Sequence, residues 1–326
     1  MTVPGSGRGR AGARPGSEQG QTGVRPGSGP ERPGTGLSVV IASVNGMPYL
    51  GRCLDALAER CPAAEVVVAD WTDQETRGEV AERWPSAKLL SFDEPMAIPE
   101  LRAAGVFAAE APVVALIEDH CLVSPAWAER LASAHASGHG VVGGPIRNVA
   151  TERIRDWAAF FCEYSSVMEP MPRGRVDGLP GMNVSYDREA LAAIDDLLRD
   201  GRWENWLHPR LQQRGFALWC EPEAVVEHDK DFDLGEFLSQ RYHYSRSYAG
   251  MRNPELGRRR ALYALATPLL VPLLYYRMAR NVFSRGRARG KFLLATPLIL
   301  LYVVVWAFGE LVGYVFGGGR SLLRVR

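Results

Sequence analysis

Glu118, Asp119 and His120 are three consecutive side chains that can bind metal ions, and they directly follow an apolar run at residues 113–117. Such a run is typical of a buried β-strand, so the three polar side chains are predicted to lie where the strand ends. Two carboxylates and an imidazole in sequence can bind a divalent ion and, through it, a phosphate group. A polar exit from a strand into a loop would explain the same residues, because acidic side chains are common in loops.

Further polar side chains follow two earlier strand-like runs. Residues 38–42 lead to Asn45, and residues 65–69 lead to Asp70. Each run is followed by a helical pattern, and this alternation of strands and helices predicts a parallel, doubly wound sheet. Ligands bind at the carboxyl ends of the strands in such sheets. We therefore expect Asn45, Asp70 and residues 118–120 to lie together at a binding site.

The sequence around these strands resembles glycosyltransferase family 2, the inverting enzymes of the GT-A fold. Residues 38–45 resemble the opening strand of the family, and residues 66–76 resemble its second-strand motif. Residues 118–120, with Pro125 behind them, resemble the D-x-D motif, although the last member here is a histidine. The resemblance covers about residues 37–230 and implies an α/β, Rossmann-like catalytic domain with a doubly wound mixed sheet.

The resemblance implies a nucleotide-diphosphate sugar as donor and a divalent metal ion that bridges its phosphates. Because an imidazole ligand favours Mn²⁺ over Mg²⁺, which prefers oxygen ligands, we expect manganese rather than magnesium. Two of the residues in question have an alternative interpretation without a role in binding. Arg102 could be a solvent-exposed charge on a helix, and His228 could be a histidine at a strand end that binds no metal. The implied donor-binding residues are Asn45, Asp70, Arg102, Glu118 and Asp119, and the implied metal ligands are Glu118, His120 and His228.

Residues 203–215 resemble the helix that carries the general base of the family. Glu204 falls on that base, which is an aspartate in the family, so the longer side chain requires the helix to lie slightly further back. A general base must reach the acceptor hydroxyl within about 2.6–3.2 Å. The alternative is an exposed helical glutamate, since the surface is the usual place for this residue. Gly181 and Asn183 resemble a G-x-N turn on the acceptor side of the family.

Charge is distributed unevenly along the chain, although the net charge is only +1. Residues 1–36 carry +3, residues 37–257 carry −13 and residues 258–326 carry +11. A basic and apolar C-terminal part suits the anionic surface of a membrane. Residues 1–36 contain eleven Gly and five Pro and almost no large apolar side chain, so we predict that they are disordered.

Two apolar segments near the C-terminus differ in their predicted relation to the membrane. Residues 292–316 would extend about 38 Å as a helix, which exceeds the roughly 30 Å of a hydrocarbon core, so we expect this segment to span. Residues 261–283 contain two prolines and are expected to lie in the interface. A re-entrant hairpin would instead keep all the basic residues on one side of the membrane.

These observations divide the chain into four predicted segments. The absence of a signal-peptide pattern and of CxxC among five cysteines predicts reduced thiols and a cytoplasmic catalytic domain at the cell membrane. The predicted segments are a disordered region at 1–36, a GT-A domain at 37–235, a basic interfacial helix or linker at 236–260, and membrane-associated helices at 261–326.

Taken together, the residues and the resemblance predict an inverting glycosyltransferase of polysaccharide biosynthesis. Its acceptor would be a hydroxyl of a lipid-linked sugar or a glycan at the membrane surface, and no nucleic-acid partner is expected. The alternative is a catalytically weakened homologue that binds a nucleotide sugar and acts as a partner of another membrane enzyme. The departures from the family pattern at Ala69, Trp71, His120 and Trp203 support this alternative, and donor hydrolysis without acceptor would separate the two.

Overall fold

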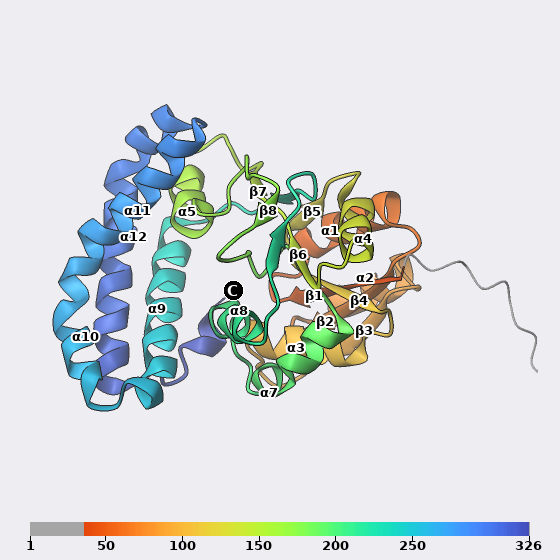
Figure 1. Cartoon of the computed structure of the whole chain (residues 1–326), viewed down its shortest axis with the longest axis horizontal. Helices are drawn as coiled ribbons and strands as arrows, with labels where there is room; N and C mark the ends of the chain where they lie inside the picture. Colours follow the sequence, from red (N-terminus) through yellow and green to blue (C-terminus); the bar gives the residue numbers. More distant parts are fainter. Residues whose placement is uncertain (1–35, 326) are drawn as a thin grey trace, which may run out of the picture. The chain divides into compact units, whose positions relative to one another are not determined.

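The structure is a computed structural model that describes residues 36–325, all of which belong to one compact unit. Its centre is an eight-stranded mixed sheet with the strand order β3-β2-β1-β4-β9-β6-β10-β8 (Figure 1). A second sheet has the order β5-β11-β7. The prediction of disorder for residues 1–36 falls outside the described residues, which begin at Gly36. The strands are β1 (Leu37–Ser43), β2 (Glu65–Asp70), β3 (Lys88–Ser91), β4 (Val113–Glu118), β5 (Cys121–Val123), β6 (Val141–Gly143), β7 (Ile146–Asn148), β8 (Gly174–Arg175), β9 (Val184–Asp187), β10 (Leu218–Cys220) and β11 (Val226–His228).

The first four strands run parallel, as the alternation of strands and helices predicts. All seven residues of β1 are buried, because this strand lies between β2 and β4 in the middle of the sheet. The register pairs Ser43 with Asp70 and Ala42 with Glu118, so the polar ends of β2 and β4 flank the end of β1. Strand β9 is antiparallel to both of its neighbours, which makes the sheet mixed.

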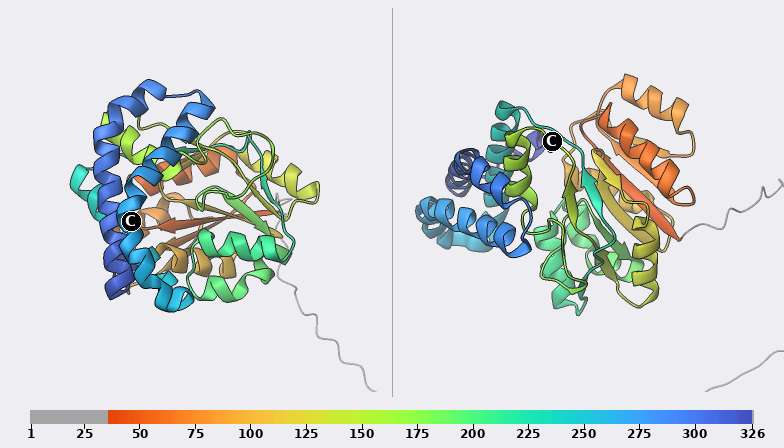
Figure 2. Two further views of the ribbon diagram at one scale, coloured as in Figure 1. Left: turned by 60° about the vertical axis from the view of Figure 1, so that its left-hand side comes forward. Right: turned by 90° about the horizontal axis from the view of Figure 1, so that it is seen from above.

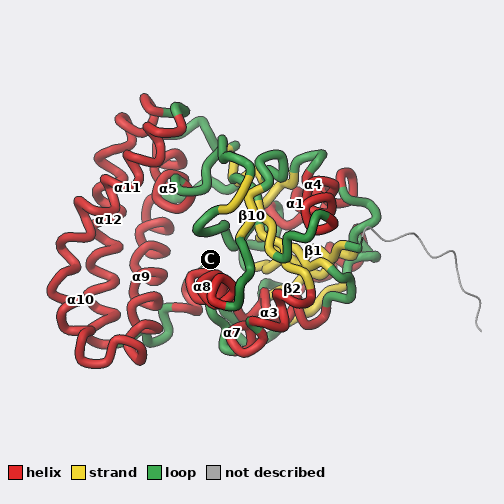
Figure 3. Tube along the Cα trace, in the orientation of Figure 1, coloured by secondary structure: helices red, strands yellow, loops and turns green. Residues whose placement is uncertain are grey.

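Helices cover both faces of the large sheet, which gives the layered α/β arrangement seen in Figures 2 and 3. Helix α3 approaches β1 especially closely, because a Cβ atom on Gly105 would lie 2.2 Å from the side chain of Val40. This packing fixes Arg102, one turn earlier in α3, beside the strand ends. The helices of this part are α1 (Tyr49–Arg60), α2 (Gln74–Arg83), α3 (Ile98–Ala108), α4 (Trp127–Ala136), α5 (Ile154–Tyr164), α6 (Arg188–Ala193), α7 (Asp195–Arg199) and α8 (Glu204–Gln213).

The C-terminal part is helical and packs on the α/β part through helix α5 (Figure 1). The helix of the first apolar segment is interrupted by a short 3-10 turn at Thr267–Leu269, which contains Pro268. By length and composition alone, two helical stretches among the described residues, Leu234–Arg285 and Arg289–Phe316, could cross a membrane. The helices are α9 (Leu234–Leu256), α10 (Arg260–Ala266), α11 (Leu270–Arg285) and α12 (Arg289–Phe316).

Two buried histidines and one partly buried histidine predict that acid lowers the stability of the fold. Burial lowers the pKa of His135 and of His208 to about 4, and it lowers the pKa of His228 well below the ordinary value. Between pH 6.5 and 4 the unfolded chain therefore binds protons that the folded chain does not, and the free energy of unfolding falls as the pH falls. For His208 alone the shift corresponds to about 3 kcal/mol at 1.36 kcal/mol per pKa unit. We expect Tm in detergent to decrease over this range.

The control for this prediction is the variant His208→Asn, which removes one of the three groups. His208 lies 3.1 Å from the hydroxyl of Tyr186, and an asparagine amide can also form hydrogen bonds. The variant should show a smaller decrease of Tm between pH 6.5 and 4 than the wild type. The same pH dependence in both proteins would show that His208 does not contribute.

Candidate active site

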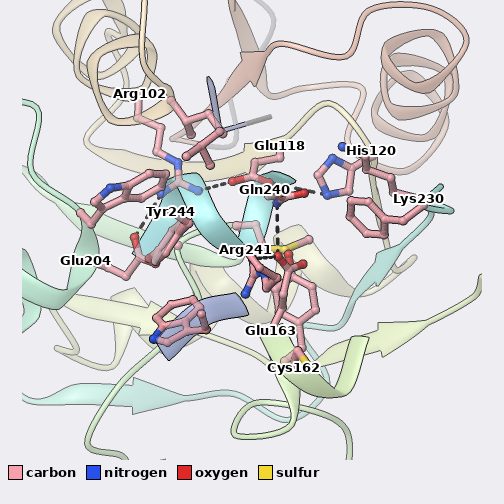
Figure 4. A pocket seen from close by; sticks show the side chains of 18 residues that line it. Arg102, Glu118, His120, Cys162, Glu163, Glu204, Lys230, Gln240, Arg241 and Tyr244 are labelled. Atoms are coloured by element: carbon pink, nitrogen blue, oxygen red, sulfur yellow. Dashed lines mark hydrogen bonds and ion pairs between the residues drawn. The ribbon is translucent and has the colours of Figure 1, made fainter. Parts of the chain in front are cut away.

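A pocket at the carboxyl end of β4 brings together residues from distant parts of the chain (Figure 4). Its walls come from the α/β part, from helices α9 and α12, and from Val325. Five residues predicted from the sequence line it, namely Arg102, Glu118, His120, Gly181 and Glu204. Five other predicted residues are not among its lining residues, namely Asn45, Asp70, Asp119, Asn183 and His228.

Arg102 joins the two carboxylates to which the sequence assigns chemistry. Its Nη2 atom lies 2.5 Å from Glu118 Oε1 at the end of β4, and its Nη1 atom lies 3.2 Å from Glu204 Oε2 at the start of α8. The guanidinium group also lies over the ring of Trp203, at 5.5 Å from its centroid. Burial opposes the charged form of Arg102, and the two carboxylates outweigh it, so the pKa of Arg102 lies above its ordinary value. Arg102 is therefore a permanent cation between two glutamates.

Gly181 makes room for this arrangement. A Cβ atom at this position would lie 2.5 Å from both Arg102 Nη1 and Glu204 Oε2. No side chain can approach that closely without displacing the ion pair. The glycine that resembles the first member of a G-x-N turn is thus required by the contact between Arg102 and Glu204.

Asp119 has a different environment from its neighbours Glu118 and His120. Its carboxylate is fully buried and accepts hydrogen bonds from the backbone of Val44 and Asn45 at 2.8 and 2.6 Å and from the Asn45 amide at 2.7 Å. Burial opposes the charged form, but the hydrogen bonds from His120 and Asn45 hold the pKa of Asp119 below its usual value. The carboxylate therefore ties the loop after β1 to the end of β4.

The same carboxylate orients the ring of His120. His120 Nδ1 lies 3.2 Å from Asp119 Oδ1, and because an ionised carboxylate only accepts, Nδ1 carries the proton. The Nε2 atom, which carries the lone pair in the neutral form of this tautomer, is buried without a hydrogen-bond partner and lies 3.6 Å from Glu118 Oε2. A carboxylate that fixes a histidine in this way is common behind metal ligands. Glu118 and His120 together fit one side of a divalent-ion site.

His228 lies beside His120 but outside the lining of the pocket. The two rings are 4.8 Å apart, and both nitrogens of His228 are buried without a hydrogen-bond partner. Burial, with His120 and Lys230 nearby, lowers its pKa well below the ordinary value, so the ring is neutral and able to bind a metal. However, no three His, Cys, Asp or Glu side chains within residues 36–325 gather closely enough to hold a metal ion by themselves.

Asp70 and Asn183 are buried and occupied by contacts within the protein. The Asp70 carboxylate accepts hydrogen bonds from Ser43 and Thr72 and forms an ion pair with Arg77 at 3.0 Å. Asn183 accepts from the indole of Trp127 at 2.8 Å and donates to backbone carbonyl groups. Both side chains therefore hold strand ends in place around the pocket.

The sequence does not predict several charged residues that line the pocket. Arg241 on α9 is buried and forms an ion pair with Glu163 on α5, to which Gln240 also donates at 3.2 Å. Lys230 is 3% exposed, and its ammonium group donates to Asn45 Oδ1 at 2.8 Å. With Arg102, these residues place three cations around the pocket (Figure 4). Lys230 lies two residues after β11, and this position close behind a strand end is the signal that could have identified it.

Comparisons with known proteins agree with this geometry. Residues 38–193 match the family described as glycosyl transferase family 2. Among solved structures, the mannosyltransferase PcManGT from Pyrobaculum calidifontis, in complex with GDP-Man and Mn²⁺, is similar with a TM-score of 0.52 and 17% identity. The similarity covers 84% of this chain and 86% of that one, and it supports the fold.

A second solved structure, residues 1–349 of TarS from S. aureus, has a TM-score of 0.44 and 12% identity over 85% of this chain and 90% of that one. No curated protein matches the chain in sequence. The match over residues 38–193, together with the mixed sheet and the position of the pocket at its strand ends, identifies residues 38–193 as a glycosyl transferase family 2 domain with a GT-A fold.

Proposed function

We propose that the protein is an inverting glycosyltransferase that uses a nucleotide-diphosphate sugar as donor. The observation that supports this most is the ion-pair chain of Glu118, Arg102 and Glu204 in one pocket at the strand ends. Arg102 lies between Glu118, the candidate metal ligand, and Glu204, the candidate base. We propose that the diphosphate leaving group and the acceptor meet at this position. Lys230 and Arg241 add positive charge to the same pocket, which suits an anionic donor.

A divalent ion fits one side of this pocket. Glu118 and the unpartnered Nε2 atom of His120 would hold it, with His228 close enough to the His120 ring to join them after a rearrangement. The phosphate oxygens of the donor would complete the ligand set, and Mn²⁺ suits mixed carboxylate and imidazole ligands. When bound, such an ion neutralises the charge that develops on the leaving nucleoside diphosphate.

Glu204 is the proposed general base. It takes the proton of the acceptor hydroxyl while the oxygen attacks the anomeric carbon from the side opposite to the nucleoside diphosphate, so the configuration inverts. Its position at the first residue of α8 places the carboxylate at the pocket, and Arg102 holds it in one orientation. Arg102 also stabilises negative charge on the donor phosphates through its fixed donor geometry.

The acceptor is proposed to be a lipid-linked sugar or a glycan at the membrane surface. Helices α9 and α12 contribute Arg241, Tyr244 and Trp306 to the pocket, so the reacting groups lie next to the apolar C-terminal helices. This contact supports a membrane-attached enzyme of polysaccharide biosynthesis, with the catalytic part on the cytoplasmic side. An acceptor that arrives along the membrane would reach Glu204 from this wall.

Binding of nucleoside diphosphates in the presence of Mn²⁺ tests the donor class. We expect GDP, UDP or dTDP to raise Tm with Mn²⁺ and much less with EDTA, because ligand at 100 times its Kd stabilises by about 2.7 kcal/mol. The complex of PcManGT with GDP-Man makes GDP the first ligand to test. His120→Ala should reduce the shift several-fold with the fold intact.

The matched control is His139→Ala, since His139 stacks on Trp219 at 3.8 Å and does not line the pocket. This variant should keep the full Mn²⁺-dependent shift. Equal shifts in the His120 and His139 variants would remove His120 from the metal site, and no shift with any of the three nucleotides would argue against the donor class.

A further inference from the structure

The linker that precedes helix α12 is attached to the catalytic part of the chain, and the segment that follows α12 returns to the catalytic pocket. Ahead of the start of α12, Arg285 at the end of α11 donates hydrogen bonds to the backbone carbonyls of Met168 and Pro170, the latter at 2.9 Å. Arg287 lies 3.4 Å from the carboxylate of Glu169 in the same loop. The linker between α11 and α12 is therefore held against the loop that follows α5.

At the other end, the chain returns to the active-site pocket. The carbonyl of Gly317 accepts a hydrogen bond from Arg246 at 3.2 Å, and the hydroxyl of Ser321 lies 3.1 Å from His243 Nδ1. Val325 is 5% exposed and lines the same pocket as Glu204. Residues 317–325 therefore lie on the same side of α12 as the catalytic residues.

Between these ends, α12 packs along the whole of α9. The rings of Phe237 and Tyr302 are 4.5 Å apart near the start of α9, and Asn253 near the end of α9 donates to the carbonyl of Gly313 at 3.0 Å. A Cβ atom on Gly309 would lie 2.0 Å from Ser245 Oγ, so the two helices touch at their backbones. Helix α9 carries arginine, histidine and glutamine side chains and continues directly from the catalytic part, so it cannot lie in hydrocarbon.

These contacts conflict with a membrane-spanning α12. A helix of 28 residues is about 42 Å long, so if it crossed a hydrocarbon core of roughly 30 Å its two ends would lie on opposite sides. In the structure the linker before α12 contacts the catalytic part, and the segment after α12 is held to α9 and returns to the catalytic pocket at Val325. We propose that α10, α11 and α12 form a monotopic platform that lies in one leaflet of a bilayer and does not cross it. The proposal rests on the membrane attachment included in the proposed function and deepens it.

The outer surface of these helices has the pattern of an interfacial platform. Large apolar side chains are exposed at spacings of three, four or seven residues, which places them on one stripe of each helix. Leu265 is 79% exposed and Phe316 is 77% exposed, which is unusual for such side chains in water. The stripes consist of Leu262, Leu265, Leu269, Leu273, Tyr276 and Phe283 on α10, α11 and the turn between them, and of Leu294, Leu301, Val304, Phe308 and Val315 on α12.

Basic side chains border these stripes at both ends of the α10–α11 segment. Arg258, Arg259 and Arg260 precede it and are exposed, and Arg287, Arg289 and Lys291 follow it and are exposed. In a spanning arrangement one of these groups would lie outside, whereas in a monotopic arrangement both contact the headgroups of one leaflet. Because these groups are positively charged, we propose that this surface binds an anionic leaflet.

Cysteine labelling in the full-length protein tests the topology. Three single substitutions introduce exposed thiols, at Glu82→Cys on the catalytic part, Gly290→Cys in the first turn of α12 and Arg320→Cys after it. A Cβ atom on Gly290 meets no other atom within 4 Å, so the substitution is tolerated. An impermeant maleimide should label none of the three in intact cells and all three in inverted vesicles, with the unsubstituted protein as background.

Two outcomes would overturn the proposal. Labelling of positions 290 and 320 from opposite sides would show that α12 spans, and labelling of both from the side opposite to position 82 would show that α12 is not attached to the catalytic part. Neither readout needs catalysis, so a failed topology is distinguishable from a failed glycosyltransferase assignment. If a variant fails to fold, the topology is determined on the unsubstituted chain instead. Protease cleavage at both Arg287 and Arg320 in inverted vesicles would support the proposal, and cleavage at only one of them would show that α12 spans.

The occupant of the surface is tested by flotation after detergent removal. The protein should float with phosphatidylglycerol vesicles and at least tenfold less with phosphatidylcholine vesicles in moderate salt. The double variant Leu265→Asp/Leu269→Asp should float less, whereas Glu82→Cys should float like the wild type. A protein that stays in solution as a dimer, with the same substitutions breaking the dimer, would show that a second copy covers this surface and would overturn the lipid assignment.

Discussion

Replacing Glu204 by glutamine is expected to lower turnover by about 10²–10⁴, the usual contribution of a general base, and to leave donor binding intact. The substitution keeps the size of the side chain and a hydrogen-bond acceptor for Arg102 Nη1, which lies 3.2 Å from the present carboxylate. It removes only the ability to take a proton. The measurement is transfer of labelled sugar at saturating donor, with Kd for the nucleoside diphosphate determined by calorimetry.

Glu189→Gln is the matched control for this substitution. Glu189 also lies in the first turn of a helix, but it is exposed and does not line the pocket. Its variant should have wild-type turnover. If Glu204→Gln keeps its turnover while Kd rises, Glu204 binds the substrate and the base is another residue. Donor hydrolysis that is absent in the wild type with every nucleotide sugar would instead favour the non-catalytic homologue.

The strand ends of the site were predictable from the sequence because they depend on local patterns. Apolar runs specify β1, β2 and β4, and parallel strands in one sheet place their carboxyl ends together. Glu118 is the last residue of β4, and Asp119 and His120 form the turn that leads to β5; Glu118 and His120 line the pocket, whereas Asp119 between them does not. Which of the three residues holds the loop after β1 depends on a hydrogen bond to Asn45, 74 residues away, and no local pattern contains it.

The wall formed by the C-terminal helices was not predictable. Arg241 has the pattern of a solvated charge on a polar helix, and Val325 is an ordinary apolar residue near the chain end. Both line the pocket because α12 packs along α9 and because residues 317–325 then turn back toward the catalytic part. Hydropathy identified 292–316 as a helix long enough to span, but hydropathy does not record where the two ends of a helix lie.

Replacing Arg102 by lysine is expected to reduce turnover by about tenfold or more, although the charge is kept, because an ammonium group cannot bridge Glu118 and Glu204 as the planar guanidinium does. Replacing it by methionine is expected to have a larger effect and to lower the free energy of unfolding by about 3–5 kcal/mol, since two largely buried carboxylates lose their cation. Urea unfolding in detergent and sugar transfer measure the two effects separately.

Arg202→Met is the control, because Arg202 stacks on Trp206 outside the pocket. Full activity in Arg102→Lys would show that only the charge matters, and equal losses in the methionine variants of Arg102 and Arg202 would show that the bridge has no special role.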